Sequence, residues 1–115
     1  MASVRETAAD ILVKVEEGAK STSVLGGRLD REDMSAQDKG FLTVLVMGTL
    51  EHLLTIDEKL RRVSSVKLSK MRPFIRNLLR ISAYQLMYLD NIPASAVCSE
   101  AVKAADRRHF KGLKG

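Results

Sequence analysis

Cysteine, proline and aromatic residues are scarce in this chain of 115 residues. It has one Cys, two Pro, two Tyr, three Phe and no Trp. A single cysteine cannot form an internal disulfide, so the fold has to hold together without one. With so few aromatic side chains, the core has to be aliphatic, built from Leu, Val, Ile and Ala, and this composition favours packed helices.

Long hydrophobic runs are also missing. The longest uninterrupted runs, such as residues 44–47, fall far short of the ~20 apolar residues that cross a bilayer. The first twenty residues carry seven charged side chains, which argues against a secretory signal. We therefore expect a cytoplasmic location and no membrane span. A chain of this length is expected to form one domain with one core.

Apolar residues recur at helical spacing in six segments, and no segment shows the alternation of a strand. We predict helices over about residues 3–17, 22–31, 35–54, 55–63, 72–89 and 93–108. The second is expected to be short or frayed because Gly26 and Gly27 lie inside it. The predicted fold class is all-α.

Several residues mark where these helices begin and end. Ser and Thr at capping positions, Pro in a first turn and Gly at a helix end are the usual signals, here Ser3 with Glu6, Ser35 with Asp38, Thr55 with Glu58, Pro73, Pro93 and Gly18. Gly48 lies inside the third helix. It either lets another helix cross closely or is a tolerated weak position.

Charge is distributed unevenly along the chain, whose net charge is +5. Residues 59–89 contain eight bases and no acid (+8), residues 1–58 contain six bases and eleven acids (−5), and residues 90–115 contain five bases and three acids (+2). If the basic third gathers on one face, it forms the electrostatic surface expected of a protein that binds a polyanion. Nucleic acid is one such polyanion.

Arg72, Arg76 and Arg80 are four residues apart, so a helix would align them in a row that could follow a phosphate backbone. Arginine suits this task because its guanidinium forms paired hydrogen bonds with phosphate oxygens. The predicted RNA-binding residues are Arg61, Arg62, Lys67, Lys70, Arg72, Arg76 and Arg80. The alternative is a solvated face, or pairing with the acidic first half of the chain. Arg80 is the expected exception, with Glu100 as its suggested partner.

A second basic patch is possible at the end of the chain. It would comprise Arg107, Arg108, His109, Lys111 and Lys114. The patch could extend the RNA surface, although cations are favoured in the last turn of any helix.

The remaining candidate residues favour structural roles. Cys98 occupies an apolar stripe on the last predicted helix and is expected to be a buried core residue rather than a nucleophile. His52 and His109 are too far apart in sequence to suggest a metal site with it, so we predict no metal site and no catalytic residue. Tyr84 and Tyr88 are expected to be core residues with hydrogen-bonded hydroxyls more often than platforms for stacking bases.

One string of residues carries a family resemblance. It runs Arg80, Tyr84-Gln85-Leu86-Met87-Tyr88-Leu89-Asp90, Ile92-Pro93 and Glu100-Ala101-Val102, with further matches at Val4-Arg5, Ala8, Ile11-Leu12 and Leu45-Val46-Met47-Gly48-Thr49-Leu50. These residues resemble the NusB-like domain at the front of small-subunit rRNA cytosine-5 methyltransferase B, the RsmB/Sun family of the NusB superfamily. The resemblance covers nearly the whole chain.

The resemblance implies a NusB-like bundle of about six helices in which residues 1–115 bind rRNA for an attached methyltransferase domain. Members of the family continue with one more helix, so we expect this chain to be cut short and to leave an apolar groove that self-association could cover. S-adenosylmethionine is expected in the missing domain. This chain has no glycine-rich loop between a strand and a helix, so it should hold no cofactor and not be an enzyme by itself.

Two alternatives remain open. The first is a NusB-type transcription antitermination factor that acts with RNA and a ribosomal protein. Family members of that type use an arginine-rich amino-terminal stretch, whereas this chain begins Met1-Ala2-Ser3-Val4. The second is a helical spacer that orients a catalytic domain without touching RNA.

Overall fold

The computed structural model describes residues 3–31 and 33–108, and these fold into helices joined by short connections. The elements are α1 (Val4–Glu16), α2 (Ser21–Leu29), α3 (Ala36–Glu51), α4 (Leu53–Val63), the short 3-10 helix η1 (Leu68–Lys70), α5 (Pro73–Tyr88) and α6 (Ala94–Arg107). No strand occurs among the described residues. The all-α prediction is confirmed.

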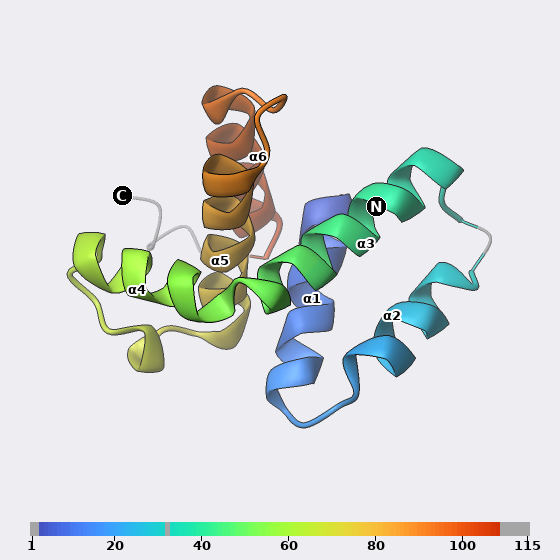
Figure 1. The fold of residues 1–115 in the computed structure, drawn as a ribbon, viewed down its shortest axis with the longest axis horizontal. Coiled ribbons are helices and arrows are strands. Elements are labelled where there is room, and N and C mark those ends of the chain that lie inside the picture. Colours follow the sequence, from blue (N-terminus) through green and yellow to red (C-terminus); the bar gives the residue numbers. More distant parts are fainter. Residues whose placement is uncertain (1–2, 32, 109–115) are drawn as a thin grey trace.

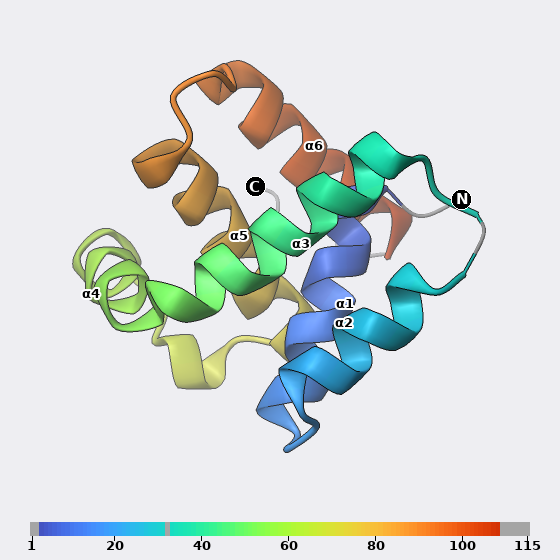
Figure 2. The ribbon, with the colours of Figure 1, turned by 45° about the vertical axis from the view of Figure 1, so that its right-hand side comes forward.

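Helices α1, α3 and α5 form the centre of the bundle, because each packs against the other two. Helix α2 covers one side of α1, and α6 returns alongside α5 (Figures 1 and 2). Helix α4 leaves the end of α3 at a bend of 78° and packs on α5. The bend turns the chain toward the loop that carries η1, at the left of Figure 1.

The core is aliphatic, as the composition predicts. Its fully buried side chains come mainly from the three central helices, namely Ala8, Ala9, Leu42, Leu45, Val46, Ile56, Ile81 and Ala104. The alanines of α1 let its neighbours approach closely. Truncating one of the buried leucines to alanine costs about 2–5 kcal/mol in proteins generally.

Most of the predicted helix boundaries are confirmed. The Ser3 hydroxyl accepts a hydrogen bond from the backbone N–H of Glu6, and the Ser35 hydroxyl accepts one from Asp38. Gly18 has φ +107°, the left-handed conformation that ends α1. The prediction that a helix begins at Thr55 is wrong. The chain bends three residues earlier, at His52, and Thr55 lies inside α4.

Gly48 permits a close approach between α3 and α5. A Cβ atom at this position would lie 2.2 Å from the ring of Tyr84, whose side chain crosses the α3 backbone there. Any other residue would have to displace that buried ring. The structure therefore favours the close-crossing interpretation of Gly48.

An apolar groove of about 540 Å³ runs between α4, α5 and α6, as predicted. Its lining includes Leu60, Val63, Leu79, Leu86, Met87, Cys98 and Ala101. Cys98 is exposed there, so its prediction as a core residue is wrong. Helix α6 packs mainly on α5 and α1, which bury Val97 and Ala104 and leave the Cys98 side of the helix uncovered. Self-association through this groove stays a prediction.

Within the described part of the chain, no single helix is long and apolar enough to span a membrane. Helices α3 and α4 reach the length and apolar composition of a membrane span only when they are counted together, across the bend between them.

Candidate nucleic-acid interface

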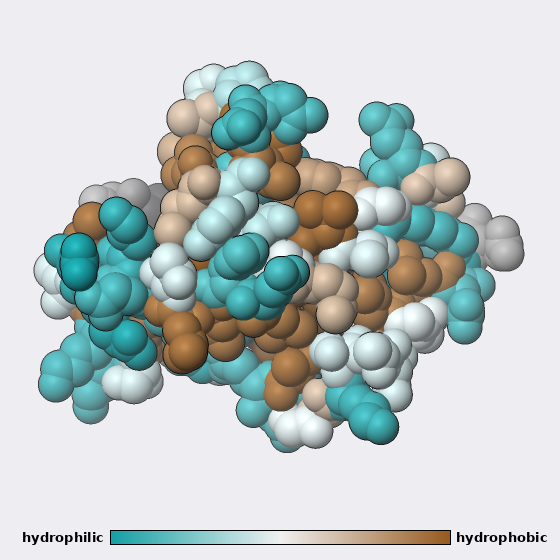
Figure 3. Space-filling model, viewed as in Figure 1, coloured by the Kyte–Doolittle hydropathy of each residue, from teal (hydrophilic) through white to brown (hydrophobic). Residues whose placement is uncertain are grey.

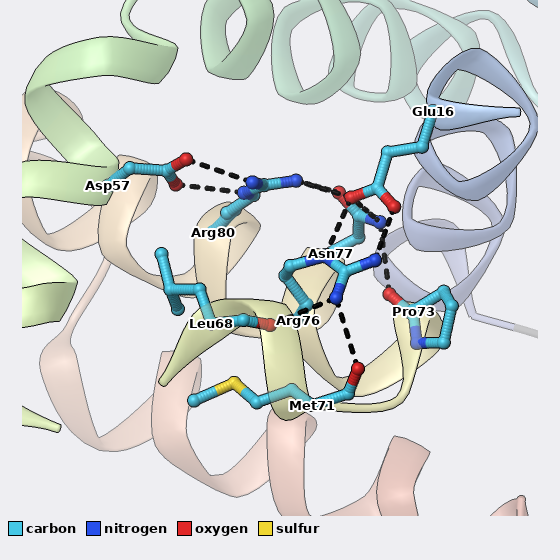
Figure 4. A network of polar contacts seen from close by, with 8 residues as sticks. All are labelled: Glu16, Asp57, Leu68, Met71, Pro73, Arg76, Asn77 and Arg80. Carbon is cyan, nitrogen blue, oxygen red and sulfur yellow. Dashed lines mark hydrogen bonds and ion pairs between the residues drawn. The ribbon is translucent and has the colours of Figure 1, made fainter. Parts of the chain in front are cut away.

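Arg76 and Arg80 lie in a network of ion pairs between α1, α4 and α5 (Figure 4). The Arg76 guanidinium donates to both carboxylate oxygens of Glu16, at 2.9 and 2.6 Å. Arg80 donates to Glu16 at 2.5 Å and makes a two-pronged contact with Asp57, at 2.8 and 2.9 Å. Asn77 donates to Glu16 at 3.0 Å and accepts from Arg80 at 3.1 Å, which completes the network.

These contacts change the interpretation of the arginine row. The Arg80 side chain is 11% exposed and its Asp57 partner 10%, so the pair is largely withdrawn from solvent. The partner expected from sequence, Glu100, instead pairs with Lys103 at 3.5 Å. The structure therefore shows the alternative in which these arginines pair with acids from the first half of the chain. Only 15% of the Arg76 side chain and 11% of the Arg80 side chain remain exposed.

The network has electrostatic consequences at both partners. The hydrogen bond from Arg76 holds the pKa of the Glu16 carboxyl below its usual value, against the effect of partial burial. The same hydrogen bond raises the pKa of Arg76. Both groups are therefore fixed in their charged forms at neutral pH.

Arg76 also holds the loop that precedes α5. Its Nη1 atom donates to the backbone carbonyls of Leu68 and Met71, at 2.9 and 3.0 Å. The first carbonyl belongs to η1 and the second follows it. A side chain on α5, held in place by Glu16 of α1, therefore fixes the connection between α4 and α5.

The other five predicted RNA-binding residues are exposed and lie on the end of α4 and on this connection. They are Arg61, Arg62, Lys67, Lys70 and Arg72, and together we call them the basic loop surface. Arg62 is paired with Glu58 on the next turn at 3.1 Å, but its side chain is still 68% exposed. Such an exposed pair contributes only a few tenths of a kcal/mol and is easily exchanged for another anion.

Part of the basic loop surface is hollowed. A depression of about 430 Å³ is lined by Arg61, Lys67 and the hydroxyl-bearing residues Ser64, Ser65 and Ser69. Arg61 and Lys67 therefore border the same depression although α4 ends between them. Among residues 3–31 and 33–108, neither makes an ion pair with a carboxylate. Hydrophilic side chains gather at this end of the molecule, the left of Figure 3.

The second basic patch is only partly described. Arg107 and Arg108 both donate to Glu6, at 2.7 and 2.9 Å, and Arg108 also donates to Asp10 at 2.5 Å. Burial tends to raise the pKa of Glu6, but the hydrogen bonds that Glu6 accepts from Arg107 and Arg108 lower it below its usual value. The two arginines thus fasten α6 to α1 rather than extend an open cationic surface. His109, Lys111 and Lys114 lie outside the described residues.

Sequence reasoning missed the carboxylates that organise this region. Glu16 and Asp57 are 60 and 23 residues away from the arginines they bind. Asp57 gave one usable signal, because it occupies an otherwise apolar position between Ile56 and Leu60 on the inner face of α4. In the part of the chain that is described, no group of three or more His, Cys, Asp or Glu side chains is arranged to hold a metal ion.

Comparison with known proteins gives a consistent family. A probable ribosomal RNA small subunit methyltransferase B of Bacillus subtilis is 38% identical over 112 residues, which make up 96% of this chain and 25% of that protein. Its counterpart in Synechocystis is 32% identical over 114 residues, 98% of this chain and 26% of that protein. The transcription antitermination protein NusB of Desulforamulus reducens is 32% identical over 101 residues, covering 86% of this chain and 71% of that protein.

The chain spans about a quarter of the length of the methyltransferases that it matches. The pattern that describes the NusB family matches residues 2–114, almost the entire chain, and the described residues form the helical bundle that the resemblance implies. The chain belongs to the NusB family.

Proposed function

We propose that this chain is a non-catalytic RNA-binding domain that positions small-subunit rRNA for an attached cytosine-5 methyltransferase domain, in the cytoplasm. The observation that carries the proposal is the basic loop surface, which concentrates exposed cations at one end of the bundle. The similarity to two methyltransferases named for small-subunit ribosomal RNA supports the choice of RNA and of partner domain.

The structure suggests how the domain would work. Arg61 and Lys67 lie beside the same depression, so a phosphate placed there would meet cations from α4 and from the following loop. The contact of Arg76 with Leu68 and Met71 holds that loop before RNA arrives, so less conformational entropy is lost on binding. Binding of this kind is mainly electrostatic and independent of base sequence.

Methyl transfer itself would belong to the attached domain. S-adenosylmethionine supplies the methyl group in such a reaction, and its binding calls for a glycine-rich loop between a strand and a helix. The described residues of this chain contain helices without strands, so they would supply RNA binding and orientation instead.

The test is the salt dependence of affinity for a fragment of small-subunit rRNA. Each phosphate neutralised on a single strand contributes about 0.7 to the slope of log affinity against log salt concentration. We expect Lys67→Glu to reduce both the affinity and this slope. Lys20→Glu, an equal charge change at the exposed start of α2, serves as the control and should have a much smaller effect. A flat slope for the unmodified protein would contradict the proposal.

A second candidate function is transcription antitermination with RNA and a ribosomal protein. The observation in its favour is that NusB of Desulforamulus reducens and NusB of Desulfitobacterium hafniense are 32% and 33% identical to this chain, which covers 71% and 72% of their lengths. The coding sequence beyond residue 115 separates the two functions. Continuation into a methyltransferase domain supports the first, and a stop after one or two more helices supports the second.

A further inference from the structure

Three aromatic side chains form a stack where α3, α4 and α5 meet. The rings of His52 and Tyr88 lie nearly parallel, with centroids 4.1 Å apart and planes inclined by 18°. Tyr84 lies beside this pair, with its ring centroid 5.5 Å from that of Tyr88 and 6.3 Å from that of His52. The ring faces that His52 and Tyr88 turn toward each other are occupied, so a nucleobase would stack on an outer face of the pair.

The stack is held in position by the fold. Tyr84 is buried and lies against Gly48, where no larger residue could fit. His52 occupies the bend between α3 and α4, with its backbone carbonyl bound to the N–H of Ile56 at 2.9 Å. Tyr88 is the last residue of α5. A ring set fixed in this way loses little side-chain freedom when a ligand binds.

The outer part of the stack is open to solvent. Tyr88 is 36% exposed and His52 is partly exposed, whereas Tyr84 is buried behind them. Exposed apolar side chains adjoin it along the sequence, with Met47 on the last turns of α3 and Leu54 on the first turn of α4. Two aromatic rings kept partly in water offer more contact to a flat ligand than to an ion.

The charges near the stack also favour a neutral base over a phosphate. Burial and the nearby carboxylate of Glu51 both raise the pKa of Tyr84. Asp90, which is exposed, follows Tyr88 by two residues. A phosphate is disfavoured beside these carboxylates, whereas a neutral nucleobase is not and can donate amino hydrogens to them.

We propose that His52 and Tyr88 form a stacking site for one unpaired nucleobase of a single-stranded RNA whose phosphates lie on the basic loop surface. This inference rests on the proposed function, since it assumes that the domain binds RNA. It adds a second kind of contact, to a base and not to a phosphate, at the opposite end of α4.

The spacing of the two sites is compatible with one strand. His52 immediately precedes α4 and Arg61 lies in its last turn, so nine residues at 1.5 Å each separate them by about 14 Å along the helix. Nine residues are also two and a half helical turns, so the two side chains leave α4 on different sides and a strand that joins them follows a path longer than this axial distance. A stacked octamer, with about 3.4 Å per nucleotide, spans roughly 24 Å. An octamer is therefore long enough to occupy both sites.

The experiment compares two RNA octamers of equal charge. One is an adenosine octamer that carries 2-aminopurine at its centre, and the other has the same backbone with abasic sites throughout. Stacking quenches 2-aminopurine fluorescence, so the first measurement needs no variant. The variants are Tyr88→Leu, which removes the ring, and Tyr88→Phe, which keeps it. Lys67→Glu reports separately on the phosphate contacts.

We expect quenching with the unmodified protein and a loss of affinity of roughly 5- to 100-fold for the base-containing octamer in Tyr88→Leu. The salt slope should stay unchanged, Tyr88→Phe should restore affinity, and the abasic octamer should bind both proteins equally. If the base-containing octamer binds Tyr88→Leu as tightly as the unmodified protein, with an unchanged salt slope, the stacking site is wrong and the proposed function stands. If neither octamer shows salt-dependent binding, the proposed function fails and the stacking site fails with it.

Discussion

The buried arginines of α5 and the exposed cations of the neighbouring loop carry the same charge within one short stretch of sequence, yet their surroundings differ completely. Arg76 and Arg80 meet carboxylates from α1 and α4 and are mostly buried. Arg61 and Lys67 line an open depression. Cationic charge in a sequence therefore does not identify a binding residue, because a carboxylate brought in from a distant helix can neutralise it. The first pair stabilises the fold, and the second is available to a polyanion.

The largest expected effect on stability comes from Arg80→Met. It removes the partner of Asp57, a carboxylate that is 10% exposed, and breaking a buried pair in this way typically lowers the free energy of unfolding by about 3–5 kcal/mol. Chemical denaturation measures the loss. Arg62→Met is the control, because its pair with Glu58 is exposed and is worth only about 0.3–0.5 kcal/mol. Equal losses in the two variants would remove the distinction between the two regions.

Arg76→Met should have a smaller and more local effect. The two hydrogen bonds to Leu68 and Met71 disappear, and bonds from a charged donor are worth about 1.5–3 kcal/mol each before solvent exposure is considered. We expect faster amide hydrogen exchange across residues 64–72 than in the core of α3. Unchanged exchange in that loop would show that Arg76 does not hold it.

A modest pH dependence should follow from the lowered carboxylate pKa values of Glu6 and Glu16. Each carboxyl has a lower pKa in the folded state than its ordinary value of 4.5, so its contribution to stability is present above pH 4.5 and is lost as the pH falls through the folded-state value. We expect the free energy of unfolding to decrease on acidification below about pH 4.5. Glu16→Gln should flatten this decrease, and a profile identical to that of the unmodified protein would contradict the assignment.

The helices were predictable from the sequence because their signals are local. Ser3 and Ser35 cap the helices that they precede, and Pro73 and Pro93 stand at helix starts. The predicted helix start at Thr55 is wrong because the spacing of Thr55 and Glu58 fits a helix interior as well as a capping box. The bend came at His52, where α3 gives way to α4.

The candidate site was less predictable because it depends on packing between distant segments. The basic composition of residues 59–89 pointed to this region as the candidate site, but it could not show which cations meet Glu16 from α1. The prediction for Cys98 failed for a similar reason. A stripe of small residues predicts that a helix packs closely against others. It does not show which side of the stripe is covered, because that depends on where the neighbouring helices, here α5 and α1, lie.

The most direct test of the division between the two regions is to compare Arg61→Gln with Arg80→Gln, two identical changes, in stability and in rRNA affinity as a function of salt. Arg61→Gln should lower the salt slope by about 0.7 and leave the free energy of unfolding within about 0.5 kcal/mol of its original value. Arg80→Gln should markedly lower the free energy of unfolding and leave the slope of the folded protein unchanged. A reduced slope with undiminished stability in Arg80→Gln would show that this arginine binds RNA and does not stabilise the fold, which would contradict the division.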